Sequence, residues 1–465
     1  PAPLVPARWR FEVDERVTAE GAVLQTLDLA SLDPILDQMA ADGIESVAVC
    51  LLFSFLHPDH EQQIGRAIAA RLPETAVSLS SVILPEYREY ERTSTTVLNA
   101  YVAPLMSRYL TRLNEQIGRR TLAIMQSNGG LISASMAGEQ AARTALSGPA
   151  GGVVGAKFVA EKAGYPNIIT FDMGGTSTDV ALVPGRLPTT STGEIIDLPL
   201  RLPMMDIHTV GAGGGSLGYV DAGGALHVGP ESAGADPGPA CYPKDGMRRQ
   251  NSVDSHAAVT DANLVLGRLD ANHFLGGTMT LNQSAAQNAL SELAEKMGVD
   301  SAENAAWGVI QVANAHMERA IRKISVERGH DPRDFTLVPF GGAGPLHACE
   351  LAENLQIPRV LIPPTPGVLS ALGMLVAAPT KDYSQTVMAD ILDFGLGISD
   401  WLSEQFVPLE EQAKDEMSAE GHDQVTINYS LDMRYKGQSH ELNIPLETLQ
   451  PDTSQNPNSK IQNLF

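Results

Sequence analysis

The stretch that decides the fold of this chain is Ile168-Ile169-Thr170-Phe171-Asp172-Met173-Gly174-Gly175-Thr176-Ser177-Thr178-Asp179-Val180-Ala181-Leu182-Val183. Apolar, β-prone residues fill its two ends, 168–171 and 180–183. Between them lie two adjacent glycines, two aspartates and three hydroxyl side chains. This order predicts a strand, a tight turn and a returning strand.

The composition of this turn is typical of a phosphate clamp. Gly174 and Gly175 can adopt positive φ, and their N–H groups can approach an anion with no Cβ in the way. Asp172 stands where a carboxylate could hold a hydrated magnesium ion, and Asp179 could bind the same metal or a water. Further donors are the hydroxyl groups of Thr176, Ser177 and Thr178. The alternative is an ordinary glycine-rich turn, which would not require acidic residues at both strand ends.

A second glycine loop is predicted between a strand at 335–340 and a helix at 346–354. The start of a helix presents free N–H groups and a positive dipole end, which suits a nucleotide. The alternative is a tight strand-to-helix corner. We expect the two glycine loops to reach the same cleft, with the amides of Gly174 and Gly175 facing open space.

Asp206 and His208 are two residues apart on an expected strand at 204–210 and would therefore point to one face. A carboxylate and an imidazole can bind a divalent metal, or act as a base and its orienting group. The alternative is one structural hydrogen bond. The segment Gly213–Gly218 matches G-x-G-x-x-G, but a hairpin pattern at 219–228 follows it instead of a helix. A dinucleotide site is therefore rejected in favour of a flexible or closely packed loop.

Two other histidine positions have structural alternatives. The spacing of His57, His60 and Glu61 superficially suggests zinc, but it does not match H-E-x-x-H, and a structural role is favoured. His347, just after the second glycine loop, is a candidate to lie near a ligand, with helix packing as the alternative.

The composition narrows the class of protein. The 465 residues allow two to four domains, and 43% apolar with 19% charged residues is typical of a soluble globular chain. A net charge of −23 argues against nucleic-acid binding. The longest apolar runs, 47–56 and 368–378, are shorter than the ~18 residues of a membrane span. Three scattered cysteines favour a reducing, cytoplasmic location.

The alternation of elements predicts an α/β fold. Expected strands lie at 9–13, 46–53 and 77–79, and expected helices at 32–42, 59–71 and 304–328. A helix at 93–116 is expected to be interrupted near Pro104, and one at 401–420 to break at Pro408. The chain is divided into 1–90, the remnant of an N-terminal lobe, 91–380, a core with the hairpin, and 381–465, a small and incomplete C-terminal α+β domain.

The pattern from Asp172 to Thr176, D-x-G-G-T, resembles the phosphate hairpin of the superfamily that contains actin, sugar kinases and heat-shock chaperones. The wider sequence resembles the hydantoinase/oxoprolinase family of ATP-dependent cyclic-amide hydrolases and related carboxylases. The segments that carry this resemblance, in consistent order, are ERTSTTVLNAYV at 91–102, MQSNGG at 125–130, SGPAGG at 147–152, DIHTVGAGGGS at 206–216, DPGPACY at 236–242 and FGGAGPLH at 340–347.

The resemblance implies actin/sugar-kinase-like (ribonuclease H-like) lobes that bind ATP and Mg²⁺. It implies opening of a cyclic amide, 5-oxoproline or a hydantoin, by phosphoryl transfer to the amide oxygen. Asp172 would hold magnesium and water, and Asp206 with His208 would contact the substrate or bind a second divalent metal. The residues that would contact the nucleotide are Gly174, Gly175, Thr176, Ser177, Thr178, Gly341, Gly342 and Gly344.

Two other functions stay open, an ATP-using carboxylase subunit and a non-catalytic nucleotide-binding subunit. A hydantoinase B-type subunit or domain and further copies of the chain are the expected partners. Since the sequence contains one D-x-G-G-T and begins at Pro1, we expect a partial chain with a half-built ATP site that binds nucleotide weakly.

Overall fold

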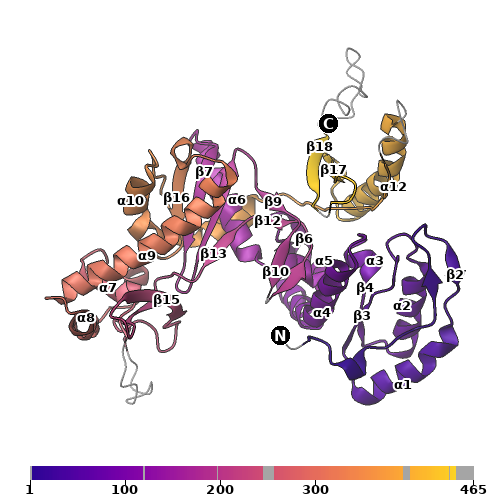
Figure 1. Ribbon diagram of the computed structural model, residues 1–465, viewed down its shortest axis with the longest axis horizontal. Helices are drawn as coiled ribbons and strands as arrows, with labels where there is room; N and C mark the ends of the chain where they lie inside the picture. Colours follow the sequence, from indigo (N-terminus) through magenta and orange to yellow (C-terminus); the bar gives the residue numbers. More distant parts are fainter. Residues whose placement is uncertain are drawn as a thin grey trace, which may run out of the picture.

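The computed structural model describes residues 3–118, 121–195, 197–243, 256–390, 398–438 and 440–446, which form a mixed α/β structure. Figure 1 shows two bulky parts, one around the strands β7, β13 and β16 and the other around β3, β4 and α4. Helix α12 and the hairpin β17–β18 lie beside the second part in this view. Within the described residues, no helix is long and apolar enough to cross a membrane.

The N-terminal part is built on two parallel strands, β3 (Ser46–Val49) and β4 (Ala76–Leu79). The helices α1 (Leu32–Asp42) and α2 (Asp59–Arg71) have the bounds that the sequence predicted. They contribute buried Leu36, Met39, Ile64 and Ile68 to one apolar core. Gly43, with φ of 64°, ends α1 in the left-handed conformation that favours glycine.

The prediction of a strand at 9–13 is wrong. Residues Ala7–Trp9 form a 3₁₀ turn, closed by bonds from Trp9 N to Pro6 O and from Arg10 N to Ala7 O. The Arg10 guanidinium also donates to Val5 O at 2.8 Å. These local bonds use the groups of Trp9 and Arg10 that a sheet would need, and the first strand is β1 (Arg16–Val17), which pairs with β2 (Val23–Gln25).

The break expected at Pro104 is also wrong, because α4 runs unbroken over Glu89–Ile117. Proline lacks an N–H, so Ala100 O, four residues earlier, loses its helical partner. The hydroxyl of Ser46 donates to that carbonyl at 2.7 Å and satisfies it. Pro408 likewise lies inside a continuous helix, α12 (Ile398–Ala419). At Pro104, a tertiary contact therefore overrides a local helix-breaking signal.

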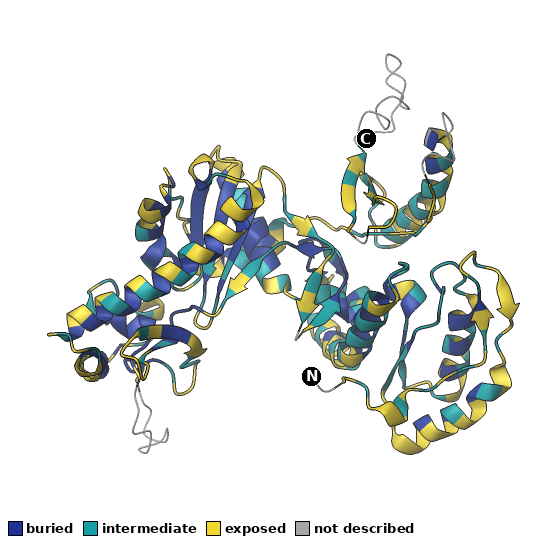
Figure 2. Cartoon of the chain, viewed as in Figure 1, coloured by how far each residue is buried: buried dark blue, intermediate teal, exposed yellow. Residues whose placement is uncertain are grey.

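The central sheet has the strand order β13-β8-β7-β16. β7 (Asn167–Met173) and β8 (Thr178–Pro184) form the predicted antiparallel hairpin, and β16 (Thr336–Phe340) pairs with β7 in parallel. On the outer side of the hairpin, β13 (His208–Val210) pairs with β8. Figure 2 shows these strands as a largely buried layer.

Helices cover both faces of this sheet. On one face, α6 (Ser147–Lys162) and α11 (Leu369–Val376) pack on side chains that include Ile168, Ala181 and Phe340. On the other face, α9 (Ala302–Ile324) and α10 (Gly344–Leu355) cover alternate residues, including Ile169, Phe171 and Val180. Instead of extending to residue 328, α9 is followed by a 3₁₀ turn at Val326–Arg328 that ends at Gly329.

Short elements complete the described chain. Helices α3, α5, α7 and α8 span Ser80–Ile83, Ala134–Glu139, Val259–Val265 and Gln283–Met297. The remaining hairpins and pairs are β5 (Ala123–Met125) with β6 (Leu131–Ser133), β9 (Thr189–Thr190) with β12 (Met204–Met205), β10 (Gly193–Ile195) with β11 (Leu198–Leu200), β14 (Ser216–Val220) with β15 (Leu226–Ser232), and β17 (Tyr429–Met433) with β18 (Leu442–Leu446).

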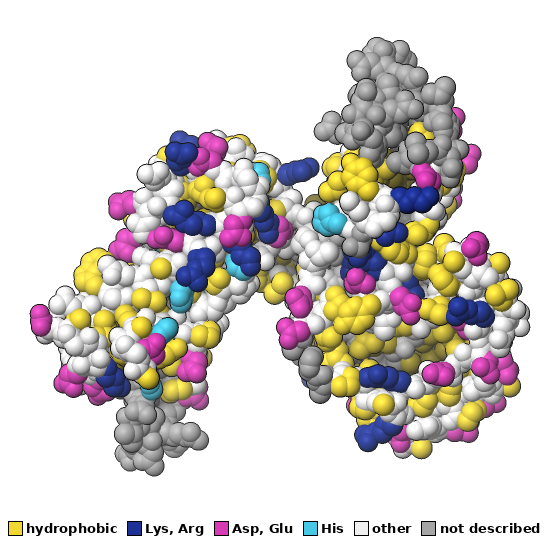
Figure 3. Space-filling view, viewed as in Figure 1, with side chains coloured by type: hydrophobic (Ala, Val, Ile, Leu, Met, Phe, Trp, Pro, Cys, Tyr) yellow, Lys and Arg dark blue, Asp and Glu magenta, His cyan; other side chains and the backbone are white. Residues whose placement is uncertain are grey.

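Hydrophobic side chains gather on the surface of the N-terminal part in the view of Figure 3. Among the large apolar residues of α4, Tyr101, Leu105 and Tyr109 are 72%, 66% and 58% exposed. They follow one another at intervals of four residues and so lie along one side of the helix.

The contact between α6 and α11 depends on glycine. A Cβ atom at Gly155 would lie 2.4 Å from Leu369 O, and one at Gly373 would lie 1.8 Å from Gly151 O. Both obstacles are backbone atoms, which cannot rotate away as a side chain can. The two helices can therefore pack at this distance only without side chains at these positions.

We expect Gly373→Ala to destabilise the protein by about 2–4 kcal/mol, because the helices must separate to admit one methyl group. Urea denaturation measures this change, and Gly367→Ala, at a position with no atom within 4 Å of a Cβ, serves as the control. Equal midpoints for the two variants would contradict the close helix contact.

Candidate functional site

The turn of the β7–β8 hairpin spans residues 174–177. The N–H of Gly174 donates to Ser177 O at 3.0 Å, so this amide does not face open space as expected. Gly175 and Thr176 are exposed at the tip, and their N–H groups donate to no atom of the described residues. The free donors of the turn therefore lie one residue later than the sequence suggested.

A second loop, Gly213–Gly215, lies directly on this turn. Gly214 N–H donates to Gly174 O at 2.9 Å, and Gly215 N–H donates to Gly175 O at 2.6 Å. A Cβ at Gly213 would lie 2.7 Å from the carbonyl carbon of Gly175. The run is thus a closely packed loop, one of the two expected alternatives. Its three consecutive glycines were the signal for this contact, which was not predicted.

The third loop, 341–344, joins β16 to α10 beside the hairpin. Because Phe340 pairs with Asp172 in register, the loop starts at the level of that carboxylate. Gly341 has φ of 78°, and a Cβ there would lie 2.3 Å from Asp172 Oδ1. The N–H of Ala343 donates to Met173 O at 3.0 Å. The two predicted glycine loops therefore lie side by side at one edge of the sheet.

Asp172 and Asp179 are direct cross-strand partners in the hairpin, so their side chains share one face. Alternation along the strands places them on the face covered by α6 and α11, with Ile168 and Ala181. Thr209 Oγ1 donates to Asp179 Oδ1, and no cation pairs with either carboxylate among the described residues. Two adjacent anions without a cation suit a divalent metal ion that other oxygen ligands complete.

Burial, and to a smaller extent the neighbouring Asp179, raise the pKa of Asp172 to about 6. Burial also raises the pKa of Asp179, while the bond from Thr209 opposes that change. Both shifts have the physical cause expected for carboxylates that lack a counter-ion. No set of three or more His, Cys, Asp or Glu side chains that could hold a metal occurs among the described residues. A metal here would therefore need ligands from a bound molecule or from water.

The start of α6 lies on the same face as the two carboxylates. The helix leads into β7 through a short connection, so it runs antiparallel to that strand. A Cβ at Gly152 would lie 2.6 Å from the ring of Phe340, whose register partner is Asp172. The N-terminal ends of α6 and α10 therefore approach the same edge of the sheet from opposite faces. Their positive dipole ends favour an anion there.

Asp206 and His208 are not brought together with these carboxylates. The expected strand 204–210 is interrupted between β12 and β13, and His208 pairs with Val180 on the α9 face. Asp206 accepts two bonds from the guanidinium of Arg328, one of them 3.1 Å from Nη2 to Oδ1. Burial, Lys323 and Arg328 lower the pKa of His208. This geometry does not support a shared metal or catalytic role for the pair.

The other histidines have structural partners. His60 Nδ1 lies 2.8 Å from Glu15, and Glu61 accepts bonds from the N–H groups of Leu51 and Ser81. These contacts agree with the structural role favoured for the H-x-x-H-E segment. His347 is fully buried and bonds to Asn314 and Asn263 rather than facing open space.

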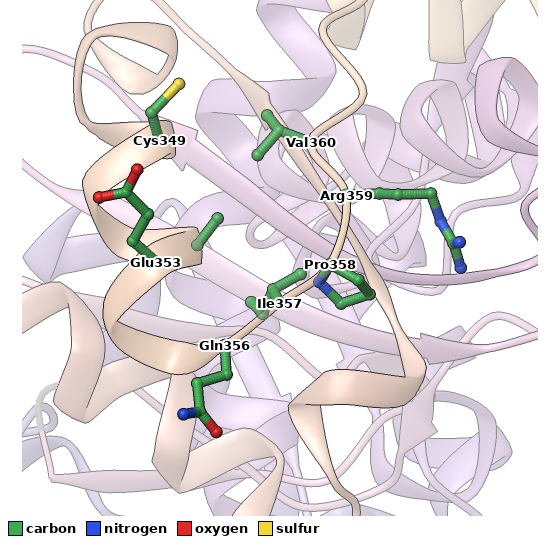
Figure 4. Close-up of a pocket in the computed structure, with 8 residues that line it drawn as sticks. Cys349, Glu353, Gln356, Ile357, Pro358, Arg359 and Val360 are labelled. Atoms are coloured by element: carbon green, nitrogen blue, oxygen red, sulfur yellow. The ribbon is translucent and has the colours of Figure 1, made fainter.

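A pocket of about 390 Å³ lies elsewhere, at the C-terminal end of α10 (Figure 4). Its lining includes Cys349, Glu353, Gln356 and Arg359. The glycine loop is at the opposite end of this 12-residue helix. The pocket is therefore separate from the paired carboxylates and contributes nothing to them.

We expect Asp172→Asn to stabilise the metal-free protein above pH 6. The pKa of Asp172 is higher in the folded state than its ordinary value of 3.8, so the folded state binds more protons between pH 4 and 6. Wild-type stability should therefore fall as pH rises through this window, and the asparagine variant should avoid that loss. At pH 8 the gain should be about 1–3 kcal/mol.

Urea unfolding at pH 4.5 and pH 8 in the presence of a chelator tests this expectation. Asp33→Asn, an exposed position in the first turn of α1, is the matched control. The same pH dependence in wild type and in Asp172→Asn would show that this carboxylate is not desolvated.

Comparison with known proteins identifies the family. The family model described as hydantoinase/oxoprolinase matches residues 92–383, and the model of the hydantoinase/oxoprolinase N-terminal region matches residues 1–72. Caprolactamase subunit alpha of Pseudomonas jessenii is 37% identical over 97% of this chain and 65% of its own length. Acetophenone carboxylase gamma subunit of Aromatoleum aromaticum is 32% identical over 94% and 61%. 5-Oxoprolinase 1 of Arabidopsis thaliana is 36% identical over 79% and 30%.

Two solved structures share the fold. The crystal structure of the ATP-dependent caprolactamase from Pseudomonas jessenii superposes with a TM-score of 0.84 at 36% identity, over all of this chain and 67% of the other. The nucleotide-free structure of acetone carboxylase superposes with a TM-score of 0.74 at 28% identity, over all of this chain and 66% of the other. The chain thus spans about two thirds of the length of the caprolactamase alpha subunit. From these matches, the chain belongs to the hydantoinase/oxoprolinase family.

Proposed function

We propose that this chain forms the nucleotide site of an enzyme that couples ATP hydrolysis to the opening of a cyclic amide. The observation that carries the proposal is the meeting of three glycine loops beside the paired carboxylates of Asp172 and Asp179. The names of the relatives support it, since one is an ATP-dependent caprolactamase and another a 5-oxoprolinase.

The free amides at the edge of the sheet would bind phosphate oxygens. Gly175 and Thr176 supply exposed N–H groups from the hairpin, and Gly342 supplies an exposed one from the loop before α10. The hydroxyls of Thr176 and Ser177 can add donors. Thr178 is buried and donates to Ala212 O, so its hydroxyl holds the loop and does not reach a ligand. Gly341 and Gly344 would act through close backbone packing, and Gly174 through its backbone hydrogen bonds with Ser177 and Gly214.

Asp172 and Asp179 would hold Mg²⁺, which fits two adjacent carboxylates whose remaining ligands are phosphate oxygens and waters. When bound, the ion neutralises charge on the phosphates. The carboxylates fix its position relative to the hairpin tip, and Thr209 orients Asp179. Asp206 is not assigned to metal binding, because Arg328 already occupies its oxygens.

The chemistry begins with transfer of the γ-phosphoryl group to the amide oxygen of the substrate. The bond from phosphorus to ADP breaks and a new phosphorus–oxygen bond forms, which makes the amide carbon a good electrophile. Water then adds to that carbon, the carbon–nitrogen bond breaks and the nitrogen takes up a proton, which leaves an acyl phosphate. A second water hydrolyses this acyl phosphate to a carboxylate and inorganic phosphate. The role of the chain is to position the phosphates and stabilise their charge.

The proposal also includes a more specific fold than the mixed α/β architecture. We infer that the sheet β13-β8-β7-β16 with its helices is one lobe of an actin/sugar-kinase-like pair. In such a pair the nucleotide lies between lobes, which agrees with the carboxylates lying on the α6 face. The names of the relatives describe alpha and gamma subunits, so a second subunit is the proposed partner.

An ATP-using carboxylase is the second candidate. The acetophenone carboxylase gamma subunit and the acetone carboxylase structure favour it, because both match this chain along nearly all its length. The same nucleotide site would serve either reaction. The carbon substrate distinguishes them, a cyclic amide in one case and a ketone with bicarbonate in the other.

In the full-length protein with its partner subunit, Asp172→Asn should reduce ATP turnover by at least ~100-fold, because the metal loses a ligand beside the transferred group. Phosphate release is measured with caprolactam, 5-oxoproline, a hydantoin, or acetone plus bicarbonate. Asp206→Asn should stay within about threefold of wild type, since its partner is an exposed arginine. The proposal fails if the first variant retains turnover, or if no nucleotide is consumed with any substrate.

Gly341→Ala should weaken binding of Mg·ATP by ~10-fold or more. Its Cβ would collide with Asp172 Oδ1, and its φ of 78° is unfavourable for alanine. Gly298→Ala is the matched control, because Gly298 has φ of 69° but no atom within 4 Å of a Cβ. Titration calorimetry compares the two. Equal affinities would show that the 341–344 loop does not shape the nucleotide site.

A further inference from the structure

His347 joins three helices behind the glycine loops. It lies in the first turn of α10, immediately after the 341–344 loop, and its side chain is 0% exposed. Its Nδ1 is 2.8 Å from Asn314 Oδ1 on α9, and its Nε2 is 3.3 Å from Asn263 Nδ2 on α7. Both nitrogens of the ring are therefore engaged by amides from separate elements.

The partners of these two amides determine which ring nitrogen carries the proton. Asn314 Nδ2 donates to Glu350 Oε2 at 2.6 Å, so its oxygen faces His347 and accepts from Nδ1–H. Asn263 Nδ2 also donates to Val259 O at 3.1 Å, so its nitrogen faces His347 and donates to Nε2. Asn314 requires a proton on Nδ1 and Asn263 requires an unprotonated Nε2, so together they specify the neutral imidazole with its proton on Nδ1.

The charged groups near this ring are Arg268, which follows α7, and Glu350 on α10, and they bind each other. Burial, and to a smaller extent Arg268, lower the pKa of His347 to about 4. The neutral ring that the hydrogen bonds require is thus the form present near neutral pH. A protonated ring would place an N–H against the N–H group of Asn263.

These bonds link two of the glycine loops through their helices. Asn263 lies one turn after Thr260, whose N–H and hydroxyl both donate to Gly214 O at 2.7 Å. Gly214 in turn donates to Gly174 O in the hairpin. On the other side, His347 belongs to the helix that begins at Gly344. A path of hydrogen bonds and helix backbone therefore runs from the hairpin through Gly214, α7 and His347 to the 341–344 loop.

We propose that His347 is a positioning residue, which holds the Gly213–Gly215 loop and the 341–344 loop in fixed positions around the hairpin. It is buried away from the exposed amides and acts through the helices that carry the loops. That the loops bind a nucleotide rests on the function proposed above. Their fixed arrangement does not depend on it.

The test uses the full-length protein and His347→Phe, which keeps a planar ring but removes both hydrogen bonds. Amide hydrogen exchange of peptides covering 213–215 and 341–344 should rise about tenfold in both loops, and the Kd for Mg·ATP should rise about tenfold. His347→Gln retains one donor and one acceptor and should recover most of both effects. Asn263→Ala removes the Nε2 contact from the other side and replaces His347→Phe if that variant does not fold.

His60→Phe is the matched control, since it removes another buried histidine, 4% exposed, whose partner Glu15 lies in the N-terminal part. It should leave exchange in both loops unchanged. Unchanged exchange in His347→Phe, or equal loosening in His60→Phe, would overturn the positioning role. If wild type binds no Mg·ATP, the proposed nucleotide function fails, and the exchange measurements still decide the role of His347.

Discussion

Close approach of three backbone segments around the turn at 174–177 is the constraint on which the site depends. The carbonyl groups of Gly174 and Gly175 each accept an N–H from the 213–215 loop, and Gly341 leaves no room for a Cβ beside Asp172. Because the carbonyls are used in this way, the exposed N–H groups of Gly175 and Thr176 remain at the tip. The packing therefore requires glycine in the two neighbouring loops, at Gly213, Gly215 and Gly341, and leaves the tip of the turn with free amides that can bind an anion.

The pleat of the sheet places the two carboxylates and His208 on opposite faces. Asp172 and Asp179 lie on the α6 face. His208 pairs with Val180 and lies on the α9 face. Asp206, nearby, is bound to Arg328. A shift of one residue in the register of β13 would move His208 to the face of Asp179 and Thr209 to the α9 face. On one face, Asp172 and Asp179 have no cation partner and their pKa values are raised. On the other face, Asp206 is paired with Arg328. The chemistry therefore depends on strand register as much as on residue type.

Glycine also controls the larger packing of the helices. The α6–α11 contact brings backbone atoms of Gly151 and Gly373 so close that no side chain fits between them. This contact fixes α6 against the sheet, with Gly152 in its second turn against the ring of Phe340, the register partner of Asp172. Behind the opposite face, His347 and its two asparagine partners connect α7, α9 and α10. The edge of the sheet is thus supported on both faces by specific contacts.

The sequence by itself determined the features that depend on neighbouring residues. The hairpin, the helices at 32–42 and 59–71 and the strand–loop–helix at 335–354 were predictable, because apolar periodicity and glycine positions act locally. The motifs that resemble the hydantoinase/oxoprolinase family were also recognisable along the chain. The closeness of the hairpin and the 341–344 loop was expected from the superfamily resemblance and from the helix start after that loop, and the parallel pairing of β16 with β7 produces it.

Tertiary structure decided what depends on residues far apart in the chain. The helix through Pro104 continues because Ser46, 54 positions from Ala100, bonds to the freed carbonyl. Asp206 and Arg328 are separated by 122 positions, so no local pattern revealed that the carboxylate is already paired. The packing of Gly214 on Gly174 and the proton position on His347 likewise depend on distant partners. Local sequence sets which conformations and charges are available, and only the folded chain determines which partner each group meets.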